Sequence, residues 1–326
     1  MKTRALVSLI AIFLAAICVG AASAQVYPSR PITIVVPLAA GGPLDTLSRI
    51  LAEPMRVSLG QPVIVENVTG AAGTVGTGRV ARAAPDGYTI AMGFLGTHVL
   101  NGAIYPLPYD VVKDFDPIAL ISSNPHVIVV KAGLPAKNLG EFIAWLKLNP
   151  DKASAGTAGA GTSTHMGGLL LQQSAGVRFQ LVPYRGAAPA LQDVMAGQID
   201  LMVDVASNSL PYLQGGKIKA YAVTASARLA SAPDVPTVDE AGLPGFHMST
   251  WYGFFGPRGM PRDILAKLNA ATVSGLADPA VSRRLADLGL DIPQRDQQTP
   301  EGLATLQRAE IEKWWPIIKA ANIKPE

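Results

Sequence analysis

Short apolar runs alternate with amphipathic stretches along most of this chain. Residues 32–36 form an unbroken β-branched run, which is typical of a strand buried on both faces of a parallel sheet. Apolar residues within 47–55 then recur at helical spacing, and Pro54 is expected to kink or shorten that helix. Strand followed by helix is the pattern of an α/β protein with parallel sheets covered by helices.

The same alternation predicts elements further along the chain. Asn138 and Glu141 form a helix-start signal, and a second helix should follow residue 165 with Met166, Leu169, Leu170 and Gln173 on its buried side. Another helix is expected to begin at Pro189 and to end at Gly197. Further strands are predicted at residues 63–65, 88–92, 127–130, 199–203 and 219–224, and C-terminal helices at 261–274, 279–288 and 299–320.

No flexible linker and no internal repeat divides the chain, although about 300 residues favour two domains. Two domains without a linker indicate a chain that crosses to the second domain and returns. We place the crossings near residues 119–125 and 245–253. This gives a first lobe of residues 25–122 and 249–326, a second lobe of residues 123–248, and a ligand cleft between them.

The first 24 residues have the pattern of a secretory signal peptide. Lys2 and Arg4 precede an uncharged apolar run and a small-residue stretch that ends at Ala24. We expect cleavage before Gln25 and a soluble protein in the periplasm. The one cysteine, Cys18, lies inside the apolar run after Ile17, which argues against a lipoprotein cleavage site.

Without the signal peptide the chain is electrically almost neutral and contains no cysteine. It loses two of its 27 basic side chains and none of the 24 acidic ones. There is no basic run that would favour nucleic acid or an anionic membrane, and no disulfide or thiolate metal site is possible. Stability must therefore come from packing, for which a hydrophobic fraction of 49% is ample.

Two glycine-rich segments between a strand and a helix are candidate binding sites. In the first, Leu38, Ala39, Ala40, Gly41, Gly42, Asp45 and Thr46 form a turn whose amides can face an anion. In the second, Gly159, Gly161, Thr162, Ser163, Thr164 and His165 form a donor-rich cup for a carboxylate at a helix N-terminus. The first segment equally fits an ordinary turn with Asp45 as helix cap, and the second a flexible loop with a Ser/Thr cap.

Several single residues follow the carboxyl ends of predicted strands, where ligands of α/β sheets bind. They are Thr97, His98, Tyr184, Arg185 and Asp204. Each also has a structural interpretation, since a lone His is often a buried structural group and an Arg is often exposed or paired between domains. Trp251 and Tyr252 are explained by packing at the return crossing.

The motifs of common enzymes and nucleotide-binding proteins are missing. There is no Gly-x-Ser-x-Gly turn, no His-Glu-x-x-His helix and no phosphate-binding lysine loop, and the four histidines are scattered. We therefore predict a binding protein with no catalytic residue, no metal and no cofactor.

Taken in order, several short motifs resemble one family over nearly the whole mature chain. They are Pro28-Ser-Arg-Pro, Ala39-Ala-Gly-Gly, Gly60-Gln-Pro-Val-Ile-Val-Glu-Asn, Pro85-Asp-Gly-Tyr, Pro108-Tyr-Asp, Val182-Pro-Tyr-Arg-Gly, Gly197-Gln-Ile-Asp and Trp251-Tyr-Gly. The chain resembles the Bug-type extracytoplasmic substrate-binding proteins of tripartite tricarboxylate transporters. The resemblance implies a type II periplasmic-binding-protein fold, with two α/β lobes around a ligand cleft.

The resemblance also implies which residues hold a ligand. In the family, the loop after the first strand and the Gly/Thr/Ser loop of the second lobe bind a carboxylate, and these match residues 38–46 and 159–165 here. Asp204, Tyr184, Thr97 and His98 fall where family members line the pocket. The chain departs from the family at Leu38, where an aromatic residue is common, at Pro43-Leu44, and at residues 205–208.

The expected function is a monomeric periplasmic receptor that closes over a small mono-, di- or tricarboxylate, aliphatic or aromatic. Its partner would be the membrane permease of a tripartite tricarboxylate transporter. One alternative is a ligand-sensing receptor for a signalling partner. Another is an exported hydrolase or isomerase that uses Asp45, His98 or His165 as acid or base.

Overall fold

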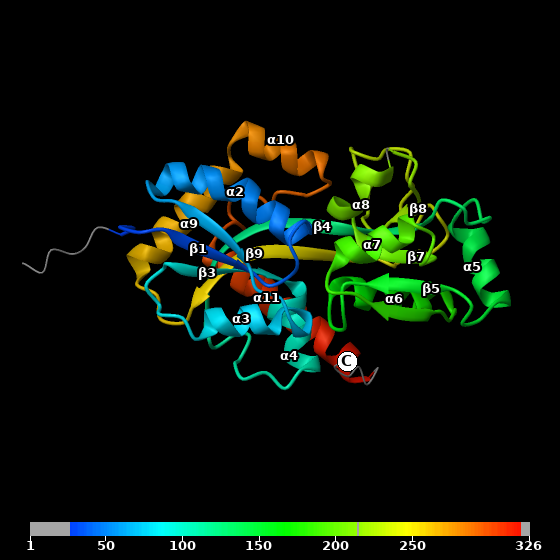
Figure 1. Cartoon of the computed structure of the whole chain (residues 1–326), viewed down its shortest axis with the longest axis horizontal. Coiled ribbons are helices and arrows are strands. Elements are labelled where there is room, and N and C mark those ends of the chain that lie inside the picture. Colours follow the sequence, from blue (N-terminus) through cyan, green and yellow to red (C-terminus); the bar gives the residue numbers. More distant parts are fainter. Residues whose placement is uncertain (1–26, 214, 321–326) are drawn as a thin grey trace, which may run out of the picture.

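One long strand joins two α/β halves in the computed structural model, which describes residues 27–213 and 215–320 (Figure 1). This strand, β4 (Phe115–Lys131), pairs with β9 (Ser249–Pro257) over its first part. Over its last part it pairs with β7 (Leu201–Val205) on one side and β8 (Ile218–Val223) on the other. The predicted signal peptide, its cleavage site and Cys18 lie outside the described residues.

The sheet of the first half is mixed. β1 (Ile32–Val36), β2 (Val63–Asn67) and β3 (Thr89–Phe94) are parallel, with β1 in the middle. β9 then pairs antiparallel with both β3 and β4. The expectation of a parallel sheet is therefore correct for β1–β3 and wrong for the strands beside them, because β9 re-enters this half from the second half.

Helices cover both faces of this sheet. One face carries α2 (Pro43–Leu59), α9 (Arg262–Leu276) and α10 (Pro279–Asp287). The other carries α3 (Thr74–Ala81), the π-helix η2 (Gly96–Leu100), α4 (Asn101–Ile104) and α11 (Pro300–Ala320), and the 3₁₀ turn η1 (Ala71–Gly73) precedes α3. Alternation along β1 explains the two layers, since Ile34 packs under α2 while Val35 packs on the opposite side.

The second half repeats this three-layer design. β5 (Ser154–Thr157) lies between β6 (Gln180–Pro183) and β7 and is parallel to both, and β7 pairs antiparallel with β4. α5 (Leu139–Leu148) and α6 (Ser163–Ala175) pack on Ile128 and Val130 of β4. α7 (Ala187–Met195) and α8 (Ala206–Leu213) pack on Val127 and Val129, on the other face.

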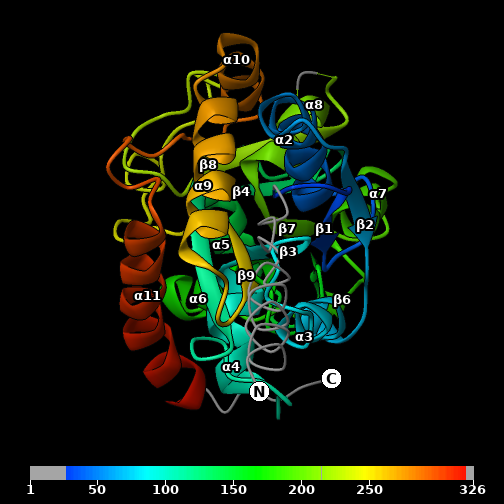
Figure 2. The ribbon, with the colours of Figure 1, turned by 90° about the vertical axis from the view of Figure 1, so that its left-hand side faces the viewer.

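Some predicted elements need correction. α2 continues through Pro54 to Leu59, and its Pro54 ring packs near Gly275 of α9, which lies alongside it (Figure 2). On α6 Met166 is buried as predicted and Leu171 is buried as well, whereas Leu169 and Leu170 are half-buried and Gln173 is exposed. α7 begins at Ala187, before Pro189.

The strand predicted at residues 127–130 is much shorter than β4. The part of β4 before residue 127 contains Pro117, Pro125 and the polar residues Ser122 and Asn124, and this stretch does not have the pattern of a buried strand. Both polar side chains are nevertheless completely buried, and Asn124 donates to the hydroxyls of Ser207 and Tyr252. Pairing with β9 supplies the backbone partners that make this stretch extended.

Within residues 27–213 and 215–320, none of the helices combines the length and apolar character needed to cross a membrane.

Candidate functional site

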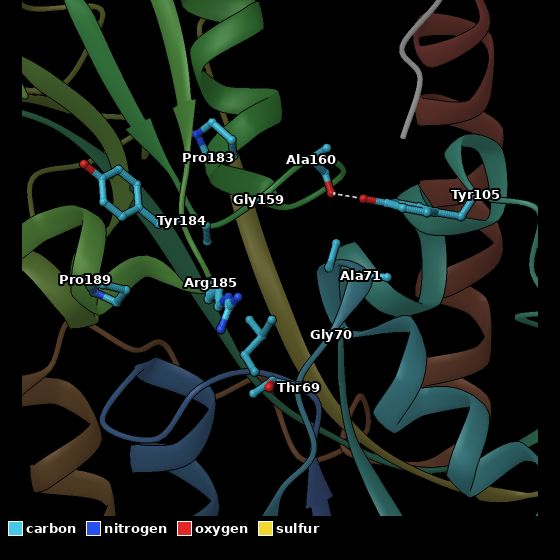
Figure 3. A pocket seen from close by; sticks show the side chains of 14 residues that line it. Thr69, Gly70, Ala71, Tyr105, Gly159, Ala160, Pro183, Tyr184, Arg185 and Pro189 are labelled. Atoms are coloured by element: carbon cyan, nitrogen blue, oxygen red, sulfur yellow. Dashed lines mark hydrogen bonds between the residues drawn. The ribbon is translucent and has the colours of Figure 1, made fainter. Parts of the chain in front are cut away.

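A cleft of about 800 Å³ opens between the two halves (Figure 3). Leu38, the segment Thr69–Gly73 and Tyr105 line it from the first half. Residues 158–160, the segment Pro183–Arg185 and Pro189 line it from the second half. Most of this lining consists of backbone and small or apolar side chains.

The first glycine loop is held in place by Asp45. The amide of Gly41, a residue with φ of 81°, donates to the Asp45 carboxylate at 3.0 Å, and Arg49 forms an ion pair with the same carboxylate at 2.9 Å. Burial by itself would raise the pKa of Asp45, but the hydrogen bonds from Arg49 and the Gly41 amide outweigh it and lower that pKa. Asp45 is 4% exposed, and its carboxylate stabilises the loop from within. Leu38 is the residue of this loop that lines the cleft.

The second glycine loop is folded by its own hydroxyl groups. Thr162 donates to the carbonyl of Gly159 at 2.7 Å, and the amide of Ala158 donates to Thr164 at 2.8 Å. Thr162 is also the N-cap of α6 and accepts from the His165 amide. Gly159 and Ala160 therefore form the cleft wall, while residues 162–165 are at most 8% exposed.

The two halves touch beside the cleft. Tyr105 donates its hydroxyl hydrogen to the carbonyl of Ala160 at 2.9 Å, as Figure 3 shows. A Cβ atom on Gly161 would lie 2.7 Å from Oδ1 of Asn101, and one on Gly186 would lie 3.6 Å from Cβ of Ala39. Both glycines belong to the second half and both neighbours to the first, and only at Gly161 does the absence of a side chain permit the close approach, since 3.6 Å is an ordinary contact distance.

Thr97 and His98 lie in the core of the first half. The His98 ring is completely buried and stacks on Phe255, with ring centroids 3.9 Å apart, and Thr97 lies 3.0 Å from its Nδ1 atom. Burial lowers the pKa of His98 to about 3, so its ring is neutral. Neither side chain lines the cleft.

Asp204 is also enclosed, at the end of β7. Its carboxyl accepts hydrogen bonds from Asn208 at 2.7 Å and Ser209 at 2.6 Å, both from α8, which follows it. Burial raises the pKa of Asp204 to about 7, although these hydrogen bonds act in the opposite direction. Burial has the opposite effect on a histidine, and it lowers the pKa of His165.

Of the candidate residues named from the sequence, Leu38, Gly159, Tyr184 and Arg185 line the cleft. The structure adds residues that were not among those named as candidates from the sequence: Thr69–Gly73, Tyr105, Ala158, Ala160, Pro183 and Pro189. The glycines at positions 70 and 73, which follow a strand and precede a helix, carry the same signal as the first glycine loop. Tyr105 gives no such signal, because only the fold brings it to the cleft.

No cluster of three or more His, Cys, Asp or Glu side chains suited to a metal ion occurs in the part of the chain that the structure describes.

Comparison with known proteins gives a consistent result. The family model described as "Tripartite tricarboxylate transporter family receptor" matches residues 47–323. The structure of MatC from Rhodopseudomonas palustris with bound malate is 43% identical, has a TM-score of 0.86, and covers 90% of this chain and 100% of its own. The periplasmic binding protein BugD is 40% identical with a TM-score of 0.87, covering 91% and 100%. Rpa4515 of R. palustris with adipate is 31% identical with a TM-score of 0.88, covering 92% and 100%.

These matches confirm the resemblance and the fold class expected from the sequence, two α/β halves of a periplasmic-binding-protein fold. They also place the chain among solute-binding receptors rather than enzymes.

Proposed function

Because the chain belongs to the tripartite tricarboxylate transporter receptor family, we propose that it captures a small carboxylate in its cleft and delivers it to a membrane permease. The observation that carries this proposal is a cleft of about 800 Å³ with walls from both halves, which touch through Tyr105 and Ala160. That volume lies within the range of pockets for small ligands.

The ends of two helices support an anionic ligand. α2 and α6 begin in the two glycine loops, and the first amides of a helix have no partner within the helix. These amides and the helix dipoles favour negative charge at both places. Malate and adipate, which are bound in two structures similar to this one, carry such charge.

We propose that residues 25–122 and 249–326 act as one lobe and residues 123–248 as the other. The ligand would contact both lobes and so stabilise the closed arrangement at the expense of an open one. β4 and β9 would carry the motion, since they connect the halves. The site residues predicted from the sequence belong to this proposal, with Leu38, Gly159 and Tyr184 in direct contact with the ligand and the others behind them.

We propose a periplasmic, monomeric receptor, and the predicted signal peptide and the similarity to the periplasmic protein BugD support the location. The permease partner is proposed from the family alone.

A thermal-shift screen over carboxylates tests the proposal. A ligand present at 100 times its dissociation constant should stabilise the native state by about 2.7 kcal/mol. The matched control for each acid is its neutral amide, which should produce no shift. The proposed function is wrong if no mono-, di- or tricarboxylate raises the melting temperature above that of its amide.

A further inference from the structure

Arg185 is the one charged residue among those that line the cleft in the described part of the chain. Its side chain is exposed and extends from the second half toward the wall that carries Thr69 (Figure 3). The remaining lining consists of glycine, alanine, proline and leucine with one threonine and two tyrosines. The cleft therefore has a local positive charge that the sequence composition does not reveal.

No described residue neutralises this charge. Within residues 27–213 and 215–320, Arg185 forms neither an ion pair nor a side-chain hydrogen bond. The nearby acid Asp193 accepts a hydrogen bond from Tyr184 at 2.6 Å, and Asp45 is paired with Arg49. An unpaired guanidinium has a planar set of donors that matches the two oxygens of a carboxylate.

The backbone that carries Arg185 is fixed on both sides. The hydroxyl of Tyr184 is anchored on Asp193 of α7, and Gly186, with φ of 144°, lies against Ala39 of the first glycine loop. Because an anchored backbone loses less freedom on binding, the guanidinium can contribute to affinity rather than only to attraction at long range.

The cleft is also larger than one carboxylate requires. A ligand held by its first carboxylate at the amides of the glycine loops leaves most of about 800 Å³ for the rest of its chain. Since the other lining groups are apolar or carry no charge, a second anionic group has one cationic partner in the cleft.

We propose that Arg185 binds a second carboxylate, so that the preferred ligand is a dicarboxylate. This inference rests on the proposed function and narrows its ligand class. Arg185 would set specificity between diacids and monoacids of the same length.

Calorimetric titration of the full chain with two matched pairs of acids tests the proposal: succinate with butyrate, and adipate with hexanoate. In Arg185→Gln, affinity for the better diacid should fall about 10- to 100-fold, the range expected for a lost hydrogen bond to a charged group. Affinity for the monoacids should stay within about twofold of wild type. The control is Arg178→Gln, which removes the same charge from an exposed site paired with Asp151 in the same half.

The possible outcomes separate the two proposals. If a diacid binds wild type and Arg185→Gln equally well, the role of Arg185 is wrong and carboxylate capture stands. If Arg185→Gln weakens monoacids as much as diacids, Arg185 contacts the first carboxylate and the inferred preference is wrong. If no acid binds wild type, the proposed function fails, and the inference built on it fails too.

Discussion

The carboxyl group of Asp204 has lost all contact with solvent, yet only one of its oxygens accepts hydrogen bonds. Oδ2 accepts from Asn208 and Ser209, while Oδ1 has no partner among the described residues. A buried carboxylate with incomplete hydrogen bonding is unfavourable, and this is why burial raises its pKa to about 7.

The stability of the protein should therefore depend on pH through Asp204. Between the ordinary aspartate pKa of about 3.9 and about 7, the folded state holds a proton that the unfolded state releases, so stability falls as pH rises through this window. Asp204→Asn removes this effect. The free energy of unfolding of the variant minus that of wild type should be at least about 1 kcal/mol higher at pH 8 than at pH 4.

Chemical denaturation of both proteins at the two pH values measures this gain. The control is Asp234→Asn, which replaces an exposed carboxyl group of the second half. A difference between Asp204→Asn and wild type that is the same at pH 4 and pH 8 would contradict a raised pKa.

At the scale of elements, α5 shows how a local signal is used. Asn138 accepts a hydrogen bond from the Glu141 amide at 2.9 Å, and the Glu141 side chain accepts one from the Lys137 amide at 2.8 Å. These two bonds cap the helix, which starts where the sequence predicted. α5 lies at the end of the second half that is farthest from the first half (Figure 1).

Asn138→Ala should lower the free energy of unfolding by about 1 kcal/mol, since the amide of Glu141 loses its partner. Ligand affinity should be unchanged because α5 is remote from the cleft. Denaturant unfolding and calorimetry measure the two quantities, and Lys147→Ala on the exposed side of the same helix is the control. A loss of affinity in Asn138→Ala alone would contradict the independence of α5 and the cleft.

At the scale of the whole molecule, one close contact between the halves depends on a residue without a side chain. Gly161 has φ of 77° and faces Asn101 of the first half, whereas Gly197 has nearly the same φ of 78° and open space around it. The two positions impose the same backbone strain on a larger residue, and only Gly161 adds a clash across the cleft.

Gly161→Leu should thus weaken ligand binding about tenfold or more while Gly197→Leu leaves it near wild type. Both variants should lose similar stability and keep the same circular dichroism spectrum. Calorimetry gives the affinities, and X-ray scattering with ligand should show Gly161→Leu more expanded than the control. Equal affinity in the two variants would contradict closure at this contact.

How far the sequence predicts the structure depends on the distance over which a signal acts. The β-branched run of β1, the cap of α5 and the C-terminal helices follow from residues within one or two turns of each other, and these predictions are correct. β4 was underestimated because its proline and polar residues become extended only by pairing with β9, more than 100 residues away.

The glycine loops were located from sequence because a strand, a turn and a helix are neighbours in the chain. Which of their groups face the cleft was decided by the tertiary structure. Asp45 and the Thr162 and Thr164 hydroxyls are used within their own loops, and His98 packs in the core. These outcomes depend on which donors and surfaces meet after folding.

The sequence by itself thus determined the class of fold, the family and the two loops that begin α2 and α6. Only the tertiary structure decided that Tyr105 meets Ala160 and that Arg185 stands unpaired in the cleft. The physical reason is that local patterns govern backbone conformation, whereas a binding cleft is formed by segments distant in sequence whose contacts exist only when both halves are folded.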